Sequence, residues 1–568
     1  MRRQRGLVLV ALSVCIAMFG VACGSDDNNN AGDTTTTNAN VPKGGTLVIG
    51  AEQEPDCMDW IATCSGSTWG DYMVKEQTMP ATYTFVKDAS GNYSYKYNSL
   101  VLSEEPKLET DPVQKITYKI NPKAVWSDGV AITSSDFKYT WDQIANGTDV
   151  YDKTGYDLVE GVNDTDPATA VVTFKAGKTF ADWRGLFVGN YGIFPSHLLQ
   201  GKDRDAEMKD GYGFSAGPWM LEGGKAGWVK TDSITLVPNP KFWGQKPNLD
   251  KVIFKVQADT AAEFTAFKSK QVSAIWPQPQ PDAVDQINAG LPGVSKDISA
   301  KTSQFESLWI NNAVAPFNEV AVRQAFAYAI DRNAMIQRLF GALGVKQPLQ
   351  DINAPIVNTF TDVNAYSKYK LDLDKVNSLM TGAGWAKGAD GIWAKNGQKA
   401  SFKIRTTAGN KRRELTEQIL QPMLKTAGFD MQVDNQKAGD LFGKSLPTGD
   451  FQAAIYAQVL TTLQPSTCAL FCSKNMHPIG TPGGTNYTRT NIPALDEQLL
   501  KADSATSDSS LAAAGKAASK ISADNVISLP LDPLPSIFLW DSSKIVGDLS
   551  YNALQGPFWN LNTWGVRS

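Results

Sequence analysis

The pattern of apolar and polar residues is clearest between positions 305 and 332, FESLWINNAVAPFNEVAVRQAFAYAIDR. It opens with an apolar run, 308–310, which is typical of a buried strand, and continues through asparagines and Pro316. Apolar side chains then recur at helical spacing, which predicts a helix with one buried face, and Asn318 is its expected N-cap. These apolar side chains belong to Val322, Ala325, Phe326, Ala329 and Ile330. The stretch therefore predicts a strand, a crossing loop and a core helix.

Strand and helix patterns alternate on both sides of this stretch. Apolar or alternating runs predict strands at 47–51, 116–120, 251–257 and 401–407. Helical spacing predicts helices after Thr133, at 260–269 and at 411–427, and Thr133 with Asp136 forms a capping-box pattern. This alternation favours α/β lobes, and a chain of 568 residues is long enough for two or more domains with substantial cores.

The N-terminus has the pattern of a secretory signal peptide. Three arginines precede a short apolar run, 7–22, and small residues lead into Cys23. The run is shorter than the roughly 20 residues that a membrane-spanning helix needs. We expect a lipoprotein signal, residues 1–22, cut so that Cys23 carries a lipid; the alternative is an ordinary secretory signal with an incidental cysteine. The polar segment 23–43 is then a flexible tether, and the protein is lipid-anchored at the extracytoplasmic face of the cell membrane.

Composition bears on the class of partner. The chain has 54 Lys and Arg against 58 Asp and Glu, and removal of residues 1–22 takes the formal net charge from -4 to -7. A mildly acidic chain gives no electrostatic basis for nucleic-acid binding. The 15 Trp, 17 Tyr and 24 Phe are enough for aromatic pockets, although most are expected in the core.

Four cysteines remain once the signal segment is removed and Cys23 is lipidated. They form two close pairs, Cys57 with Cys64 and Cys468 with Cys472. In an oxidising compartment this favours two local disulfides, although four cysteines allow three connectivities. Neither spacing is the two-residue gap usual for zinc, and the chain has only two histidines, so we expect no metal site and no cofactor.

Two motifs suggest enzyme chemistry, and their context argues against it. Residues 213–217, GFSAG, have the letters of a nucleophile elbow, but the sequence after Ser215 is extended and broken by glycines where the elbow needs a helix. Residues 439–445, GDLFGKS, have three residues between their glycines, where a phosphate-binding P-loop needs four. We therefore expect no enzyme activity; a secreted hydrolase acting through Ser215 is the weakest alternative.

Several segments together resemble the family 5 bacterial solute-binding proteins, the extracytoplasmic receptors of oligopeptide, dipeptide and nickel ABC importers. Residues 311–332 are similar to the family pattern N, P-F, V-R-Q-A, A-I-D-R. Residues 126–136, WSDG followed by Thr133 and Asp136, resemble its W-S-D-G block, and 239–250 resemble its N-P-x-Y-W-G and P-x-L-D segment. The resemblance covers about residues 44 to 568.

The resemblance implies the type II periplasmic-binding-protein fold, an α/β architecture with two hinged lobes and a subdomain inserted in the first. Lobe I would comprise 44–90, 216–305 and 536–568, the inserted subdomain 91–215, and lobe II 306–535. The implied function is closure of the lobes on a small polar solute, followed by delivery to the membrane permease of an ABC importer. We expect a monomer. The alternative is an envelope lipoprotein of the same fold that regulates or scaffolds cell-wall or membrane enzymes without transport.

The solute class depends on where the family pattern breaks. In peptide-binding members, lobe II carries a segment like G-W-x-x-D-x-x-D/E-P, whose first Asp pairs with the amino group of the peptide. Placing Pro465 on the family proline puts Gln458 at the Trp position and Thr461 at that Asp position. A hydroxyl cannot supply the charge-assisted bond that a carboxylate gives an ammonium. We therefore regard an oligosaccharide or a blocked peptide as equally good candidates for the solute as a free peptide.

The expected ligand-binding residues come from three loops. They are Glu54, Trp60 and Trp69 after the first strand, Gln458 and Thr461 in lobe II, and Asn486 with Tyr487, which resemble the family's N-Y-S/T. Each aromatic could instead be a packed core residue, and Glu54 could cap a loop or form a hinge ion pair. The two predicted disulfides lie within or beside these loops and would make both walls of the site more rigid.

Overall fold

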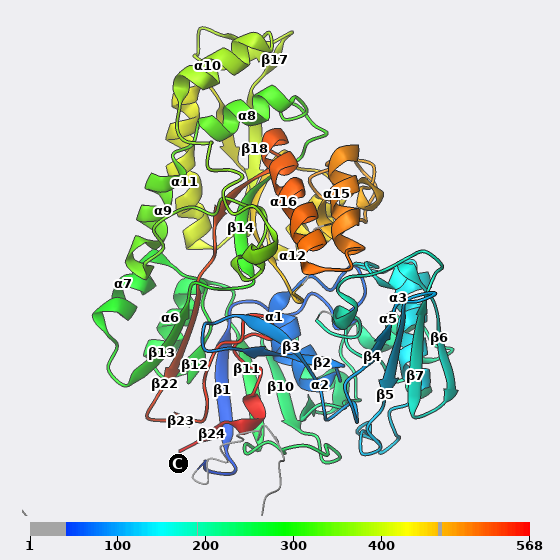
Figure 1. Ribbon diagram of the computed structural model, residues 1–568. Helices are drawn as coiled ribbons and strands as arrows, with labels where there is room; N and C mark the ends of the chain where they lie inside the picture. The colour runs from blue at the N-terminus through cyan, green and yellow to red at the C-terminus, as the bar shows by residue number, and fades with distance from the viewer. Residues whose placement is uncertain (1–40, 190, 464–467, 568) are drawn as a thin grey trace, which may run out of the picture. The chain divides into compact units, whose positions relative to one another are not determined.

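The computed structural model describes residues 41–189, 191–463 and 468–567, and its two principal sheets define two lobes (Figure 1). The sheet of lobe I has the strand order β13-β22-β12-β1-β11-β10-β8, with β9 paired to β10. The central strand β1 runs parallel to both β11 and β12, and the other neighbouring strands of the sheet pair antiparallel. The strands are β1 (Thr46–Ala51), β8 (Trp219–Leu221), β9 (Trp228–Val229), β10 (Ser233–Pro238), β11 (Lys251–Val256), β12 (Ala274–Ile275), β13 (Val294–Ser299) and β22 (Ser536–Asp541).

Short elements complete lobe I around this sheet. Helix α6 packs on β1 and β12. Strands β2 and β3 form a hairpin that follows α2 along the chain. These elements are α1 (Thr68–Gly70), the π-helix η1 (Asp71–Lys75), α2 (Glu76–Thr78), β2 (Tyr83–Lys87), β3 (Tyr93–Tyr97), α6 (Thr260–Lys268), α7 (Pro281–Ala289), β23 (Ile545–Val546) and β24 (Gly565–Val566).

A four-stranded antiparallel sheet, with the order β4-β5-β7-β6, forms the inserted subdomain. Helix α3 packs on β6 and β7, and the predicted capping box at its start is confirmed, because Thr133 and Asp136 cap each other's backbone. The elements are β4 (Lys107–Glu109), β5 (Lys115–Lys119), α3 (Ser134–Asn146), β6 (Val159–Asp166), β7 (Thr169–Phe174), α4 (Ser196–Leu199) and α5 (Arg204–Met208).

Lobe II is built on a five-stranded sheet with the order β19-β18-β20-β14-β21. Strand β14 is buried along its whole length, and helices α9 and α11 pack on the outer strands β21 and β19. The strands are β14 (Gln304–Ile310), β18 (Ser401–Arg405), β19 (Asp430–Val433), β20 (Ala453–Val459) and β21 (Ser528–Asp532), with a small sheet of β15 (Ala386–Lys387), β16 (Trp393–Lys395) and β17 (Gln398–Lys399). The helices are α8 (Val320–Tyr328), α9 (Arg332–Phe340), α10 (Leu373–Gly382), α11 (Lys411–Ala427), α12 (Ala438–Asp440), α13 (Leu446–Thr448), α14 (Cys468–Phe471), α15 (Pro493–Asp503) and α16 (Asp508–Asn525).

The chain passes between the two principal sheets twice, from β13 to β14 and from β21 to β22. The two crossings lie side by side, because the Thr302 hydroxyl donates a hydrogen bond to the Leu534 carbonyl at 3.0 Å. Ser303 on the first crossing also donates to the Ala553 carbonyl in the C-terminal segment. Two short, adjacent connections of this kind are the usual construction of a hinge between lobes.

The central motif forms the predicted strand and helix, but with different helix ends. Helix α8 is N-capped by Glu319 rather than by Asn318, and it ends at Tyr328, before Ile330. The chain breaks there because Asp331 caps a new helix, α9, by accepting from the Ala334 N–H at 3.0 Å. The hydrophobic period continues through this break, which explains why spacing alone predicted a single longer helix.

Both predicted cysteine pairs, Cys57–Cys64 and Cys468–Cys472, are disulfide-bonded. Among the residues that the structure describes, no helix is both long enough and apolar enough to cross a membrane. The signal segment 1–22, the lipidation site Cys23 and the tether as far as residue 40 lie outside the described residues.

Candidate functional site

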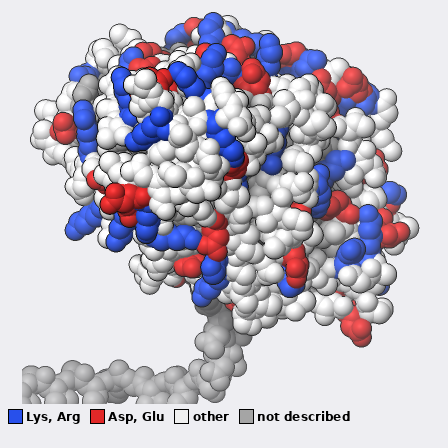
Figure 2. All heavy atoms as spheres, turned by 90° about the horizontal axis from the view of Figure 1, so that it is seen from above, with Lys and Arg blue, Asp and Glu red and all other residues white. Residues whose placement is uncertain are grey.

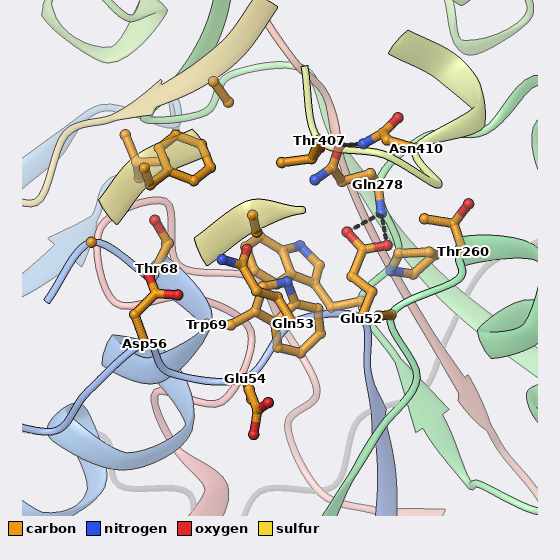
Figure 3. A pocket seen from close by; sticks show the side chains of 18 of the residues that line it. Glu52, Gln53, Glu54, Asp56, Thr68, Trp69, Thr260, Gln278, Thr407 and Asn410 are labelled. Atoms are coloured by element: carbon orange, nitrogen blue, oxygen red, sulfur yellow. Dashed lines mark hydrogen bonds between the residues drawn. The ribbon is translucent and has the colours of Figure 1, made fainter. Parts of the chain in front are cut away.

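A cavity of about 610 Å³ lies between the two lobes (Figure 3). Lobe I contributes the loop after β1, Trp69 of α1 and the segment 276–279 after β12. Lobe II contributes the end of β20, the residues that lead into α11 and the start of the α12 region. Pockets of roughly 300–1,000 Å³ bind small organic molecules and short oligomers, so this volume is in the range of a solute site.

The wall from lobe I is an acidic loop fixed against tryptophans. One carboxylate oxygen of Glu54 accepts from the indole N–H of Trp228 at 3.0 Å and from the Thr231 backbone N–H at 2.9 Å. The Ser67 hydroxyl donates to the Glu54 carbonyl at 3.0 Å and caps helix α1, which carries Trp69. The ring of Trp69 in turn packs 5.0 Å from that of Trp276. The orientation of this wall is therefore set by hydrogen bonds and ring packing that need no ligand.

Asp56 lies two residues further along the same loop and is exposed at the cavity wall. Partial removal from water, and then the negative charge of Glu54, raise the pKa of Asp56 to about 6. A positive charge placed beside these carboxylates would lower that pKa again.

Hydrogen bonds cross from one lobe to the other at the edge of the cavity (Figure 3). The side-chain oxygen of Gln278 in lobe I accepts from the Asn410 amide at 2.6 Å and from the Arg412 guanidinium at 3.1 Å. The side-chain oxygen of Gln280 accepts from the Arg412 backbone N–H at 2.7 Å. The first turn of α11 is thus joined to lobe I by three bonds.

A buried charged cluster supports that contact from behind. Glu306 of β14 accepts from Arg412 and Arg413, the latter at 2.7 Å, and all three side chains are almost completely buried. Burial alone would raise the pKa of Glu306, but the two guanidinium charges lower it to about 2. Glu52 of lobe I lies near the same arginines, and burial raises its pKa to about 7 even though the Gln278 N–H and both arginines act against this.

Two of the predicted ligand-binding residues, Glu54 and Trp69, line the large cavity. Trp60 does not, because its ring is buried in the core of lobe I and its indole N–H donates to the Tyr212 hydroxyl at 2.9 Å. The Asn486 side chain is also buried, and its amide donates to three backbone carbonyls of the segment 471–490. The neighbouring Tyr487 packs against the core of lobe II. These three residues hold loops in place and lie outside both cavities described here.

Gln458 and Thr461 line a second, smaller cavity of about 130 Å³ between the inserted subdomain and lobe II. Strand alternation accounts for Gln458, because its neighbours Ala457 and Val459 on β20 reach the large cavity while Gln458 lines only the smaller one. Val459 lines both cavities, and Thr461 follows the end of β20, where alternation no longer applies. Pro465, which anchored the sequence comparison, lies outside the described residues.

The sequence did not single out most of the polar residues that line the large cavity. Their common feature is a position just after a strand or just before a helix, which is a weak signal in a chain with many such positions. They are Gln278, Gln304, Thr407, Asn410, Arg413, Lys437 and Ser536, together with the tryptophans Trp228 and Trp276.

The residues of the suspected nucleophile elbow have a structural role. Ser215 is fully buried, and its hydroxyl contacts the Thr78 and Trp219 carbonyls and accepts from the Gly217 N–H at 3.0 Å. Across the described ranges, no three His, Cys, Asp or Glu side chains are grouped as metal ligands.

Two α/β lobes joined by paired crossings, with a cavity lined from both sides, form an architecture that could hold a solute between the lobes. Residues 100–475 match the family model described as bacterial extracellular solute-binding proteins, family 5 Middle. The chain belongs to this family of substrate-binding proteins of ABC transporters. The expectations of this family, of its two-lobe α/β fold and of a protein without enzyme activity are therefore confirmed.

The names of similar proteins specify different ligands. The oligopeptide-binding protein OppA of Mycobacterium tuberculosis is 23% identical over 508 residues, covering 87% of this chain and 81% of that protein. The periplasmic EDTA-binding protein EppA has a TM-score of 0.79 at 22% identity, covering 95% of this chain and all of that one. The oligopeptide-binding protein AppA of Bacillus subtilis, in complex with a nonapeptide, also has a TM-score of 0.79, at 19% identity, covering 93% of this chain and all of that one. Structural likeness at this identity establishes the fold of the chain and leaves its solute open.

Proposed function

We propose that the protein is a lipid-anchored receptor that closes its lobes on a small polar solute and delivers it to an ABC import permease. The cavity between the lobes carries this proposal, because its walls come from both lobes and the hydrogen bonds at its edge cross from one lobe to the other. A solute that contacts both walls stabilises the closed arrangement by its higher affinity for that arrangement.

The proposed division of the chain assigns 44–90, 216–305 and 536–568 to lobe I, 91–215 to the inserted subdomain and 306–535 to lobe II. The two principal sheets support this division, although the β2–β3 hairpin crosses its boundary at 90 and β14 begins at Gln304. The lipid on Cys23 would hold a monomeric receptor at the extracytoplasmic face of the membrane. Detergent phase partitioning tests this anchor, since the wild-type protein should enter the detergent phase and Cys23→Ser should not.

The solute itself can be sought in the purified protein. Denaturation followed by mass spectrometry should release a small molecule in stoichiometric amount. Adding it back should stabilise the protein by RT ln(1 + [L]/Kd), which is about 2.7 kcal/mol at a hundredfold excess over Kd. If nothing is released, and no member of a peptide, sugar and metal panel raises the melting temperature, the receptor function is refuted and the regulatory or scaffolding lipoprotein is favoured.

A further inference from the structure

The acidic groups of the large cavity all come from lobe I. They are Glu52, Glu54 and Asp56, on the loop that follows β1. Of these, Glu52 is buried and accepts from the Gln278 backbone N–H at 3.3 Å. Glu54 and Asp56 reach the cavity, and neither forms an ion pair within the described residues. Among the described residues of lobe II that line the cavity, none is acidic.

Most of the positive charge in the lining is already paired. The Lys230 ammonium lies 2.5 Å from Asp210, and Arg413 donates to Glu306 at 2.7 Å. Lys437 is the remaining cation of the lining, and it forms no ion pair with any described residue. Glu54 and Asp56 therefore have no described cation paired with them, which makes the lobe I wall of the cavity locally negative. The outer surface is different, because acidic and basic side chains are intermingled on the face that Figure 2 shows.

Three tryptophans line the same cavity as these carboxylates. Trp69, Trp228 and Trp276 all line the cavity, and the Trp228 indole N–H donates to Glu54. The structure shows that this environment accepts an ammonium, because the Lys230 Nζ lies 4.9 Å from the centre of the Trp228 ring. An ammonium over an indole face gains about 0.5–2 kcal/mol, and an adjacent carboxylate adds a charge-assisted bond.

The loop that carries the two carboxylates is held rigidly on both sides. The disulfide Cys57–Cys64 closes the chain directly after Asp56, and Asp59 forms a buried ion pair with Arg204 at 2.8 Å. On the other side Gly70 of α1 approaches Pro55 so closely that a Cβ atom there would lie 3.0 Å from the proline ring. The ordering cost of binding at these carboxylates is therefore small.

We propose that the solute carries a protonated amine, and that Glu54 and Asp56 of lobe I bind this group beside the tryptophan faces. This inference rests on the proposed receptor function and narrows its solute to ammonium-bearing molecules. The free N-terminus of a short peptide and the amine of an amino sugar share this chemistry.

Two matched pairs of probes test the proposal and separate the two sources. The first pair is trialanine and N-acetyl-trialanine, and the second is the glucosamine trisaccharide and its fully N-acetylated form. Titration calorimetry on the full chain at pH 7 should show about ten-fold tighter binding of the amine member in at least one pair, because acetylation removes the charge. This preference should weaken between pH 7 and pH 5, where Asp56, with a pKa of about 6, becomes protonated.

Three variants assign the effect to these residues. Asp56→Asn and Glu54→Gln should each reduce the preference for the amine, and Glu54→Gln retains an oxygen that can accept from Thr231 and Trp228. Glu109→Gln, on the exposed strand β4, is the charge-matched control and should leave the preference unchanged. Circular dichroism and melting curves of each variant verify folding.

Each contrary outcome is decisive. Equal or tighter binding of an acetylated member overturns the ammonium preference and leaves the receptor function standing. An amine preference that survives in both cavity variants overturns the assignment to Glu54 and Asp56. Binding of none of the four probes refutes the proposal as well, and the receptor function then depends on whether the purified protein releases a solute.

Discussion

Replacing Glu306 by glutamine tests the buried cluster at the meeting point of the lobes. Glu306 is fully buried on β14 and accepts from Arg412 at 3.0 Å and from Arg413 at 2.7 Å. Glutamine has nearly the same shape but removes the negative charge between two guanidinium groups. Breaking a buried ion pair on one side generally costs about 3–5 kcal/mol, because the remaining charge is left unpaired.

The pKa of Glu306 gives the magnitude for this protein. The arginines lower that pKa from 4.5 to about 2, and one pKa unit corresponds to about 1.4 kcal/mol, so the ionised group contributes about 3 kcal/mol of stability at pH 7. Asp532 lies in the same cluster, and burial, followed by the charge of Glu306, raises its pKa. Asp532 ionises more readily once Glu306 is neutral, so we expect the variant to lose about 2–3 kcal/mol.

The pH dependence has a definite sign. A carboxyl whose folded-state pKa is lowered contributes its full stabilisation above its unfolded pKa, here about 4.5, and loses it as the pH falls towards 2. The free energy of unfolding should therefore differ between the wild type and Glu306→Gln by the full amount at pH 7. The difference should shrink steadily below pH 4.5.

Urea denaturation followed by tryptophan fluorescence measures this difference at pH 7, 4 and 3. Glu497→Gln is the matched control, because Glu497 forms an exposed ion pair with Lys501 on α15. Exposed pairs of this kind contribute about 0–1 kcal/mol. A loss below about 0.5 kcal/mol for Glu306→Gln, or a difference that does not change with pH, would refute the electrostatic account.

Two further predictions concern the walls of the cavity. Replacing Cys57 and Cys64 by serine should cost about 2–3 kcal/mol of stability, because the short disulfide loop no longer restricts the unfolded chain. The variant should also bind the released solute more weakly. If its affinity and melting temperature are unchanged, the disulfide does not order the lobe I wall of the cavity. Gln280→Met removes the acceptor for the Arg412 N–H, so it should lower solute affinity about five-fold and increase the radius of gyration measured by small-angle scattering. The control variant Asn146→Ala, at the exposed end of α3, should change neither quantity.

The elements predicted best from the sequence are those with local signals. Helix α11 begins and ends where its apolar spacing predicted, at Lys411 and Ala427, since Asn410 caps it and Gly428 ends it. The capping box of α3 is equally local. The family motif also has a physical meaning in the fold. Arg323 and Arg332 are buried and donate to backbone carbonyls, including those of Phe317 and Pro530, so both arginines join separate segments of lobe II.

The site was harder to predict because it is assembled from distant segments. Gln278 and Asn410 are 132 positions apart, and only the packing of the two lobes brings their side chains within hydrogen-bonding distance. The predicted Gln458 illustrates a second difficulty. A strand presents alternate residues to opposite sides, and the sequence does not say which set faces the cavity. Glu54 and Trp69 both line the cavity, and they are close in sequence, on the loop after β1 and on helix α1.

The distribution of charge between the lobes explains how a solute and closure would depend on each other. In the proposed closure, Asn410 and Arg412 of lobe II bond to Gln278 and Gln280 of lobe I, so these contacts would favour closure with or without a solute. The same closure would bring Glu54 and Asp56 into a cavity where no described cation pairs with them, and withdrawing such charges from water would oppose it. A cationic solute would remove this opposition by supplying the missing charge. The closed state would then be favoured only when the cavity holds a solute of the right charge, which is the condition that a receptor needs before it meets its permease.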